Sequence, residues 1–165
     1  MPRKSKGGSF LKRVLAVLLV LSFLGEPAAG ATAVRGKDVM YVGGTIPNLP
    51  EATIGVLDAT SEKALRFESP KGKFEIPYEN ITSLEYGQKA GRRLGVALTI
   101  TIWALFSKKR KHFLTIGFND ESDKPQGVVL EIPKGTAKSF IIILEVRSGK
   151  KVEYESEEAK KHVHG

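Results

Sequence analysis

Short runs of β-branched, aromatic and alternating residues recur from residue 39 to residue 132, separated by clusters of Gly, Pro, Asn, Asp and Ser. Such runs between turn residues are typical of antiparallel strands. Leu65 and Phe67, for example, alternate with Arg66 and Glu68, as a half-buried strand requires. We therefore expect a mainly β (α+β) fold with about seven strands. The expected strands are residues 38–43, 53–59, 64–68, 74–76, 81–86, 111–118 and 127–132.

Residues near the C-terminal end favour one helix. Four apolar residues recur there at helical spacing, namely Ala137, Phe140, Ile141 and Leu144. Gly149 follows, where a left-handed residue commonly ends a helix. Three consecutive isoleucines instead favour a strand paired with residues 152–154. We expect the helix, because Thr136 or Gly135 can cap its start. The charged residues 155–165 lack apolar periodicity and predict a flexible tail.

Residues 1–33 have the order of a secretory signal peptide: basic residues, an apolar run at residues 14–24, and then small residues. As a helix the run would be about 16 Å long, roughly half of a bilayer's hydrocarbon thickness, so a permanent span is disfavoured. The A-x-A form at residues 31–33 predicts cleavage after Ala33, and residues 28–30 are a second candidate. An uncleaved anchor is the alternative. Residues 34–154 would then form the β domain.

Half of the net positive charge of the chain lies in residues 1–33. The full chain has 26 Lys and Arg against 18 Asp and Glu, a formal net charge of +8, and cleavage would leave 21 against 17, or +4. Because no stretch interleaves basic residues with stacking aromatics, we expect no nucleic-acid partner. The absence of cysteine excludes disulfides, Cys-ligated zinc and thiol nucleophiles.

No residue pattern predicts catalysis or a cofactor. The three histidines are His112, His162 and His164, and a His-x-His pair in a tail without a third fixed ligand favours a solvated tail over a metal site. Two glycine clusters, at residues 43–44 and 91–95, lack the Gly-Lys-Ser/Thr ending of a phosphate loop, and no Ser elbow or paired catalytic carboxylates stand out. We expect no catalytic residue, no metal, no cofactor and no enzyme activity.

The segment GKFEIPYENITSLEYGQ, residues 72–88, resembles bacterial pleckstrin-homology-like (PH-like) and GRAM-type domains. In those domains a hydrophobic-Pro-Tyr-acid-polar-Ile motif crosses from one strand to the next, and here it reads Ile76-Pro77-Tyr78-Glu79-Asn80-Ile81. TIGVLDATSEKALRFES is similar to their first hairpin, and PKGTAKSFIIILEVRSGKKVE to their closing helix with a short return. The resemblance covers residues 40–155.

The resemblance implies a strongly bent antiparallel sheet, or partly open barrel, with one end closed by the helix. Phe140, Ile141 and Leu144 would lie over the mouth of that barrel. It also implies a binding or scaffolding module without enzyme activity, whose partners are lipid headgroups, peptides or protein surfaces. The long apolar stretch between the Tyr86 strand and the Lys111 strand departs from the usual plan of these domains.

That stretch, residues 94–106, carries no charge and has basic residues on both sides. A helix of this length would reach about 20 Å, short of the roughly 30 Å hydrocarbon layer. Large aliphatic residues at even positions and small or hydroxylated ones at odd positions give strand periodicity, although a helical spacing is also compatible. The stretch can pack on the barrel, dip into a membrane interface, or serve as a second span or self-association patch.

We expect this insertion to contact an anionic membrane surface or a protein partner, with Trp103 and Phe106 at headgroup depth and the basic flanks on lipid. The candidate contact residues are Arg92, Arg93, Leu98, Ile100, Ile102, Trp103, Phe106, Lys108, Lys109 and Arg110. The predicted function is an exported, non-enzymatic module of the periplasm, cell envelope or medium. The alternative is a soluble secreted domain in which residues 94–106 are internal core or a dimer interface.

Overall fold

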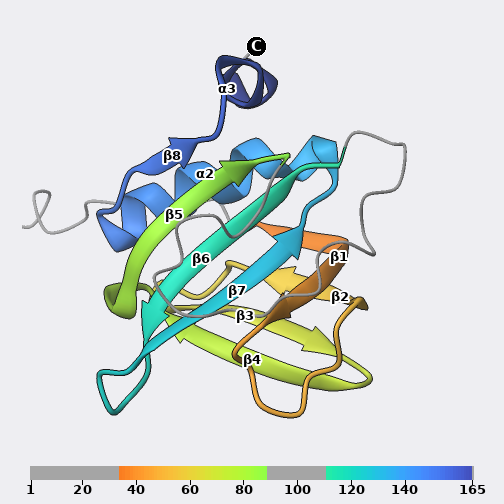
Figure 1. Cartoon of the computed structure of the whole chain (residues 1–165), viewed down its shortest axis with the longest axis vertical. Helices are drawn as coiled ribbons and strands as arrows, with labels where there is room; N and C mark the ends of the chain where they lie inside the picture. Colours follow the sequence, from red (N-terminus) through yellow and green to blue (C-terminus); the bar gives the residue numbers. More distant parts are fainter. Residues whose placement is uncertain (1–33, 89–110, 165) are drawn as a thin grey trace, which may run out of the picture. The chain divides into compact units, whose positions relative to one another are not determined.

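The computed structural model describes residues 34–88 and 111–164, in which eight strands form one mixed sheet, with one α-helix before the last strand and one after it (Figure 1). The elements are β1 (Arg35–Gly44), β2 (Thr53–Asp58), β3 (Ala64–Ser69), β4 (Gly72–Pro77), the 3-10 helix η1 (Tyr78–Asn80), β5 (Ile81–Gly87), β6 (Phe113–Asn119), β7 (Pro125–Glu131), α2 (Lys134–Ser148), β8 (Val152–Tyr154) and α3 (Glu157–His164). The prediction of a mainly β fold is confirmed.

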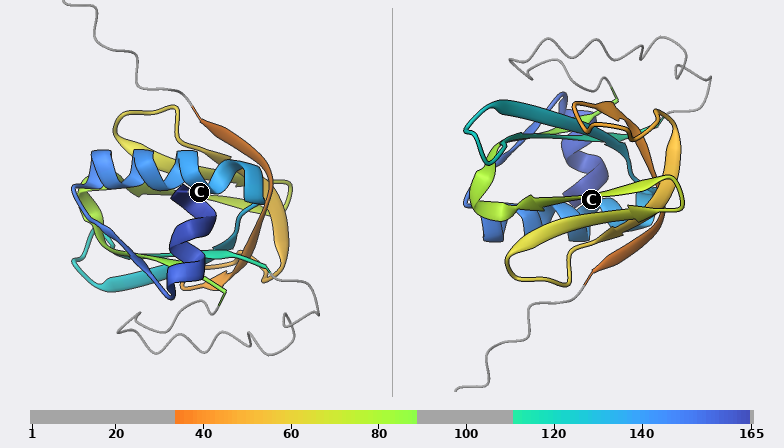
Figure 2. Two further views of the ribbon diagram at one scale, coloured as in Figure 1. Left: turned by 90° about the horizontal axis from the view of Figure 1, so that it is seen from above. Right: turned by 90° about the horizontal axis from the view of Figure 1, so that it is seen from below.

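The sheet has the strand order β4-β3-β2-β1-β7-β6-β5-β8 and bends around its own interior (Figure 2). The long strand β1 lies in the middle, and its register shifts between Gly36 and Val39 against β2 and between Tyr41 and Gly43 against β7. Such bulges bend a strand and increase its twist. The expected bent sheet is therefore present, and it is not closed, because its two edge strands, β4 and β8, do not pair.

Strand β8 was not among the seven expected strands. A strand at residues 152–154 was expected only in the alternative in which the three isoleucines form a strand. β8 pairs with β5 in parallel, so that Leu84 lies beside Val152 and Tyr86 beside Tyr154. All other pairs in the sheet are antiparallel. The purely antiparallel sheet of the prediction thus gains one parallel neighbour, because the chain returns along β5 after crossing in α2.

Helix α2 lies where the sequence predicted a helix and packs its apolar face into the bend of the sheet (Figure 2). Ala137, Phe140, Ile141 and Leu144 are at most 1% exposed and join the core cluster. Burying each of the large ones contributes about 1.5–3 kcal/mol. The helix ends at Gly149, whose φ of 69° is left-handed and whose N–H donates to the Glu145 carbonyl oxygen. This is the stop that the sequence predicted.

The C-terminal segment differs from the expected flexible tail, because residues Glu157–His164 form helix α3. Ala159 and Val163, four positions apart, are buried against the core. Glu157 and Glu158 occupy the first turn and basic side chains the last, which suits the helix dipole. In the described part of the chain, neither helix has the length and apolarity needed to cross a membrane.

Candidate functional site

The ten predicted contact residues lie outside the described residues. They are Arg92, Arg93, Leu98, Ile100, Ile102, Trp103, Phe106, Lys108, Lys109 and Arg110. The structure does place the chain on either side of residues 89–110, which contain them. Gly87 at the end of β5 and Phe113 at the start of β6 are register partners. The chain therefore leaves the sheet and returns to it at neighbouring positions.

Two polar contacts hold the chain at this point, which we call the insertion base. The backbone N–H of Gln88 donates to Oε2 of Glu155 at 2.6 Å. On the other side, Nζ of Lys111 lies 2.8 Å from Oε2 of Glu131, with both side chains about one quarter exposed at 27% and 25%. Because Glu131 is on β7 and Glu155 follows β8, the base is fixed to both neighbouring strands.

All three histidines of the chain meet Tyr86 and Tyr154 beside the insertion base, and we call these five residues the histidine–tyrosine cluster. The rings of His112 and His162 stack face to face, with centroids 3.9 Å apart and planes 6° apart. Tyr86 and Tyr154 meet edge to face at 6.4 Å. The cluster connects β5 and His112, which directly precedes β6, with β8 and α3. These C-terminal elements are far from β5 and His112 in the sequence.

Each tyrosine of the cluster shares a hydrogen bond with one histidine of α3. The Tyr86 hydroxyl lies 3.0 Å from Nδ1 of His162, and the Tyr154 hydroxyl lies 2.9 Å from Nε2 of His164. Burial raises the pKa of Tyr86 to about 12, so its phenol is neutral at physiological pH. Burial also raises the pKa of Tyr154. The two bonds fasten the last turn of α3 to the sheet.

Sequence reasoning placed His162 and His164 in a solvated tail and missed this cluster. The pairing of His112 with His162 depends on β8 bringing α3 alongside β5 and β6, which no local spacing encodes. One weak signal is available, because Ala159 and Val163 share a helix face and His162 adjoins that face. In the described segments, no three His, Asp or Glu side chains are grouped to hold a metal ion.

A groove of about 600 Å³ lies between η1, the loop after β2 and the end of α2. Its central side chain is Arg147, whose Nη1 donates to the carbonyl oxygens of Ala59 and Ser61, both at 2.6 Å, and to the Tyr78 hydroxyl at 3.1 Å. The guanidinium also lies 5.3 Å from the centroid of the Tyr78 ring. Burial raises the pKa of Tyr78 against the opposing effect of this guanidinium. Arg147 thus ties α2 to the sheet.

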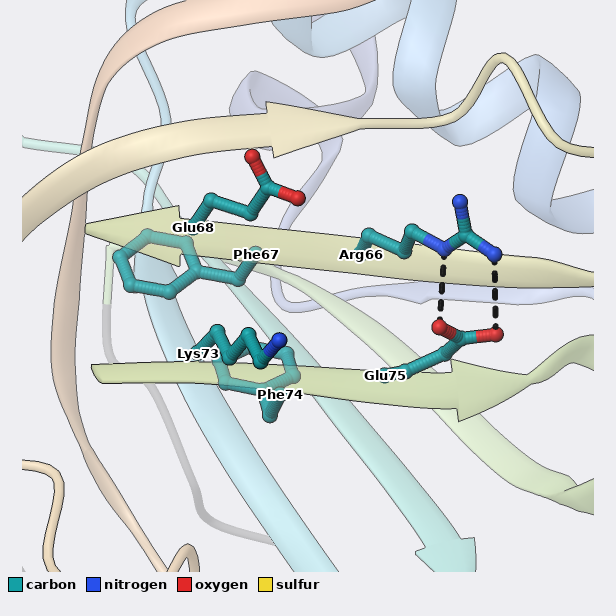
Figure 3. A pocket seen from close by; sticks show the side chains of 6 residues that line it. All are labelled: Arg66, Phe67, Glu68, Lys73, Phe74 and Glu75. Atoms are coloured by element: carbon teal, nitrogen blue, oxygen red, sulfur yellow. Dashed lines mark hydrogen bonds and ion pairs between the residues drawn. The ribbon is translucent and has the colours of Figure 1, made fainter.

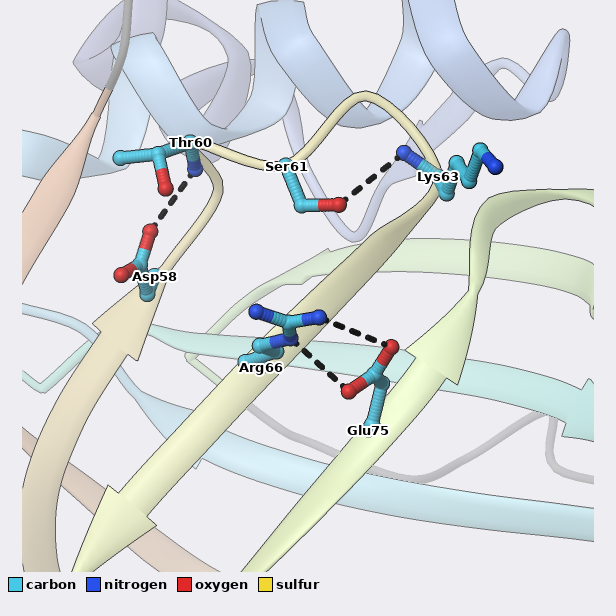
Figure 4. A network of polar contacts seen from close by, with 6 residues as sticks. All are labelled: Asp58, Thr60, Ser61, Lys63, Arg66 and Glu75. Atoms are coloured by element: carbon cyan, nitrogen blue, oxygen red, sulfur yellow. Dashed lines mark hydrogen bonds and ion pairs between the residues drawn. The ribbon is translucent and has the colours of Figure 1, made fainter.

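A second hollow of about 410 Å³ lies along the β3–β4 hairpin (Figure 3). Arg66 and Glu75 form an exposed ion pair there, with Nε 2.8 Å from Oε2. In the neighbouring β2–β3 loop the Thr60 N–H donates to Oδ1 of Asp58 at 2.8 Å (Figure 4). Burial acts to raise the pKa of Asp58, but the hydrogen bonds from Thr60 and the charge of Arg35 outweigh it and lower that pKa. These contacts order the hairpin and its loop.

Comparison with known proteins finds a similar solved structure but no matching protein family. No family model matches the chain, and no curated protein matches it. Among solved structures, a chain from the "Structure of the Spt16D Pob3N heterodimer" is similar at a TM-score of 0.45 and 12% identity, over 75% of this chain and 55% of that chain. This chain thus spans about half the length of that one.

Proposed function

We propose that this chain is an exported, non-enzymatic binding module that contacts an anionic membrane surface through residues 94–106 and their basic flanks. The observation that carries the proposal is the anchoring of the insertion. The strands before and after it, β5 and β6, end and begin at the register pair Gly87 and Phe113, and the inward side chains of both strands are buried. An uncharged stretch with basic residues on both sides suits interfacial binding, and the chain before and after it is fixed to the sheet.

The filled interior of the sheet supports this placement over the internal-core alternative. Tyr41, Phe67, Tyr86 and Phe140 are at most 1% exposed and belong to one cluster with the rest of the α2 face. Protein interiors are packed as densely as organic crystals, so a filled core does not accept further large side chains without rearrangement. This supports placing the thirteen residues 94–106, most of them apolar, at another surface.

Vesicle co-sedimentation of the full chain tests the membrane contact. We expect binding to vesicles of phosphatidylcholine with phosphatidylserine, weaker binding to phosphatidylcholine alone, and release at high salt. Replacing Lys108, Lys109 and Arg110 with Gln should weaken binding roughly 100-fold, because each basic residue near such a surface contributes about 1 kcal/mol. Protein that stays in the supernatant at low salt on both vesicles would contradict the proposal.

A pair of serine variants separates the insertion from other apolar surfaces. Trp103→Ser with Phe106→Ser should reduce partition into anionic vesicles without changing the thermal midpoint. Val146→Ser is the matched control, because Val146 is 77% exposed on α2 and is not part of the proposed contact. Loss of folding in the insertion variant with unchanged partition would favour the core alternative. The mass of the purified protein tests export, because a chain that retains residues 1–33 contradicts cleavage.

A further inference from the structure

Strand β4 ends the sheet, and its outer edge has no strand beside it in the described part of the chain. It pairs only with β3, from Ala64 opposite Pro77 to Ser69 opposite Gly72. An edge strand presents unpaired backbone N–H and C=O groups and is a ready template for another strand.

The register shows which backbone groups of β4 face outward. Just past the strand, the Tyr78 N–H donates to the Lys63 carbonyl oxygen at 3.0 Å and so faces β3. Backbone direction alternates along an antiparallel strand, so Ile76 and Phe74 also face β3. Lys73, Glu75 and Pro77 therefore direct their backbone groups outward. Pro77 has no N–H to offer, which is the usual setting for proline in a sheet edge.

The exposed side chains of the β3–β4 hairpin carry positive and negative charges in alternation. Lys73 and Glu75 are exposed, whereas Phe74 and Ile76 are buried on the other face. Across the hairpin, Glu68 lies opposite Lys73, and Arg66 lies opposite Glu75 with its ion pair (Figures 3 and 4). Each position on this surface thus faces an opposite charge.

We propose that β4 pairs antiparallel with β4 of a second copy of this chain, about a twofold axis at Phe74. In this register Lys73 of each copy lies opposite Glu75 of the other. Both residues direct their backbone groups outward, so each donates its N–H to the other's carbonyl oxygen across the axis. Their side chains lie on the same face and form two cross-strand ion pairs, which continue the charge pattern of the hairpin.

The charges also select this register over its neighbours. A twofold axis at Lys73 would place lysine against lysine, and an axis at Glu75 would place glutamate against glutamate. A slip by one residue would bring outward backbone groups against inward ones and turn buried side chains to the other face. In the proposed register Pro77 lies opposite Lys71, outside the central pairs, so its missing N–H removes no bond between Lys73 and Glu75.

Charge reversal tested by sedimentation equilibrium of the full chain separates this pairing from other modes of association. The wild-type chain should show a concentration-dependent dimer. Lys73→Glu and Glu75→Lys should each weaken the dimer roughly tenfold, because two attractive cross-strand pairs become repulsive. The double variant K73E/E75K restores opposite charges across the axis and should recover the dimer. An equimolar mixture of the two single variants should also recover it, as a heterodimer.

Two control variants show whether an effect on the dimer comes from the β4 contact itself. Lys150→Glu changes the net charge by the same amount as Lys73→Glu at an exposed site outside the hairpin and should leave the dimer unchanged. Arg66→Gln removes the partner of Glu75 within the chain and distinguishes loss of that ion pair from loss of the dimer contact. A wild-type chain that stays monomeric at every attainable concentration overturns the proposal. So does a dimer that both single variants retain but that Trp103→Ser with Phe106→Ser abolishes, since that result would place the contact in the insertion.

Discussion

Replacing Tyr86 with Phe tests the energetics of the histidine–tyrosine cluster, because it removes one hydroxyl and keeps the ring. The Tyr86 ring is 0% exposed, stands edge to face with Tyr154, and bonds to Nδ1 of His162 through that hydroxyl. At neutral pH the variant loses the hydrogen bond and leaves a partly buried imidazole nitrogen without it. We expect the free energy of unfolding to fall by about 1–2 kcal/mol.

At alkaline pH the same variant should become the more stable chain. Burial raises the pKa of Tyr86 from 10.0 to about 12 in the folded protein. The unfolded chain therefore ionises first, and the stability contributed by the neutral phenol, fully present below pH 10, is lost as the pH rises towards 12. The wild type should lose about 1.4 kcal/mol by pH 11 from this group alone, whereas Y86F has no such group. The two stabilities should cross near pH 11.

Urea unfolding of both chains from pH 7 to pH 11.5, followed by circular dichroism, measures the difference in unfolding free energy. The lysines, and the tyrosines other than Tyr86 and its neighbour Tyr154, titrate in both chains and cancel in the difference. The reasoning is refuted if the difference between wild type and Y86F stays constant from pH 8 to pH 11.5. A constant difference would mean that Tyr86 ionises equally easily in the folded and unfolded chains, and hence that the ring is not buried.

Three further substitutions test α2 and its attachments by thermal or urea unfolding. Phe140→Ala removes a ring that is 0% exposed and should destabilise the chain by about 3–5 kcal/mol; a smaller loss than Val146→Ala would contradict the packing of α2. Gly149→Ala should cost about 1 kcal/mol, because its φ is 69°, whereas Gly135→Ala, with nothing within 4 Å of an added Cβ, should be neutral or stabilising. Arg147→Ala should cost about 2–3 kcal/mol through the carbonyl oxygens left without their donor, and equal stability of R147A and wild type would exclude that attachment.

The parts of the fold that were predictable from sequence are those in which one element carries its own signal. Leu65 and Phe67 alternate with charged neighbours, and Phe140 and Leu144 recur at helical spacing, so β3 was predicted close to its observed bounds and α2 was predicted in its observed place. The expected start of α2 was wrong, because the helix begins at Lys134 with Pro133 as its N-cap, and Gly135 and Thr136 lie inside it. Gly149 marked the end of α2 because a left-handed stop is a property of one residue.

The parts that were not predictable depend on contacts between distant segments. β8 has three residues, and its parallel pairing follows from the path of α2 and not from its own composition. α3 buries only Ala159 and Val163, which is too little apolar periodicity to distinguish a docked helix from a charged tail. Its attachment comes instead from His162 and His164, whose tyrosine partners are on β5 and β8.

The two edges of the sheet are treated differently, and the difference bears on what β4 does. At one end of the sheet the short strand β8 covers β5, and α3 is attached beside β5 through His162. The edge of β4 is left with Lys73, Glu75 and Pro77, and charges and proline are the usual protection of an edge against other strands. One sign of charge is enough to keep two copies of an edge strand apart, because like charges on identical edges repel each other. β4 instead carries one charge of each sign, two positions apart, which repels misaligned copies and attracts one in register.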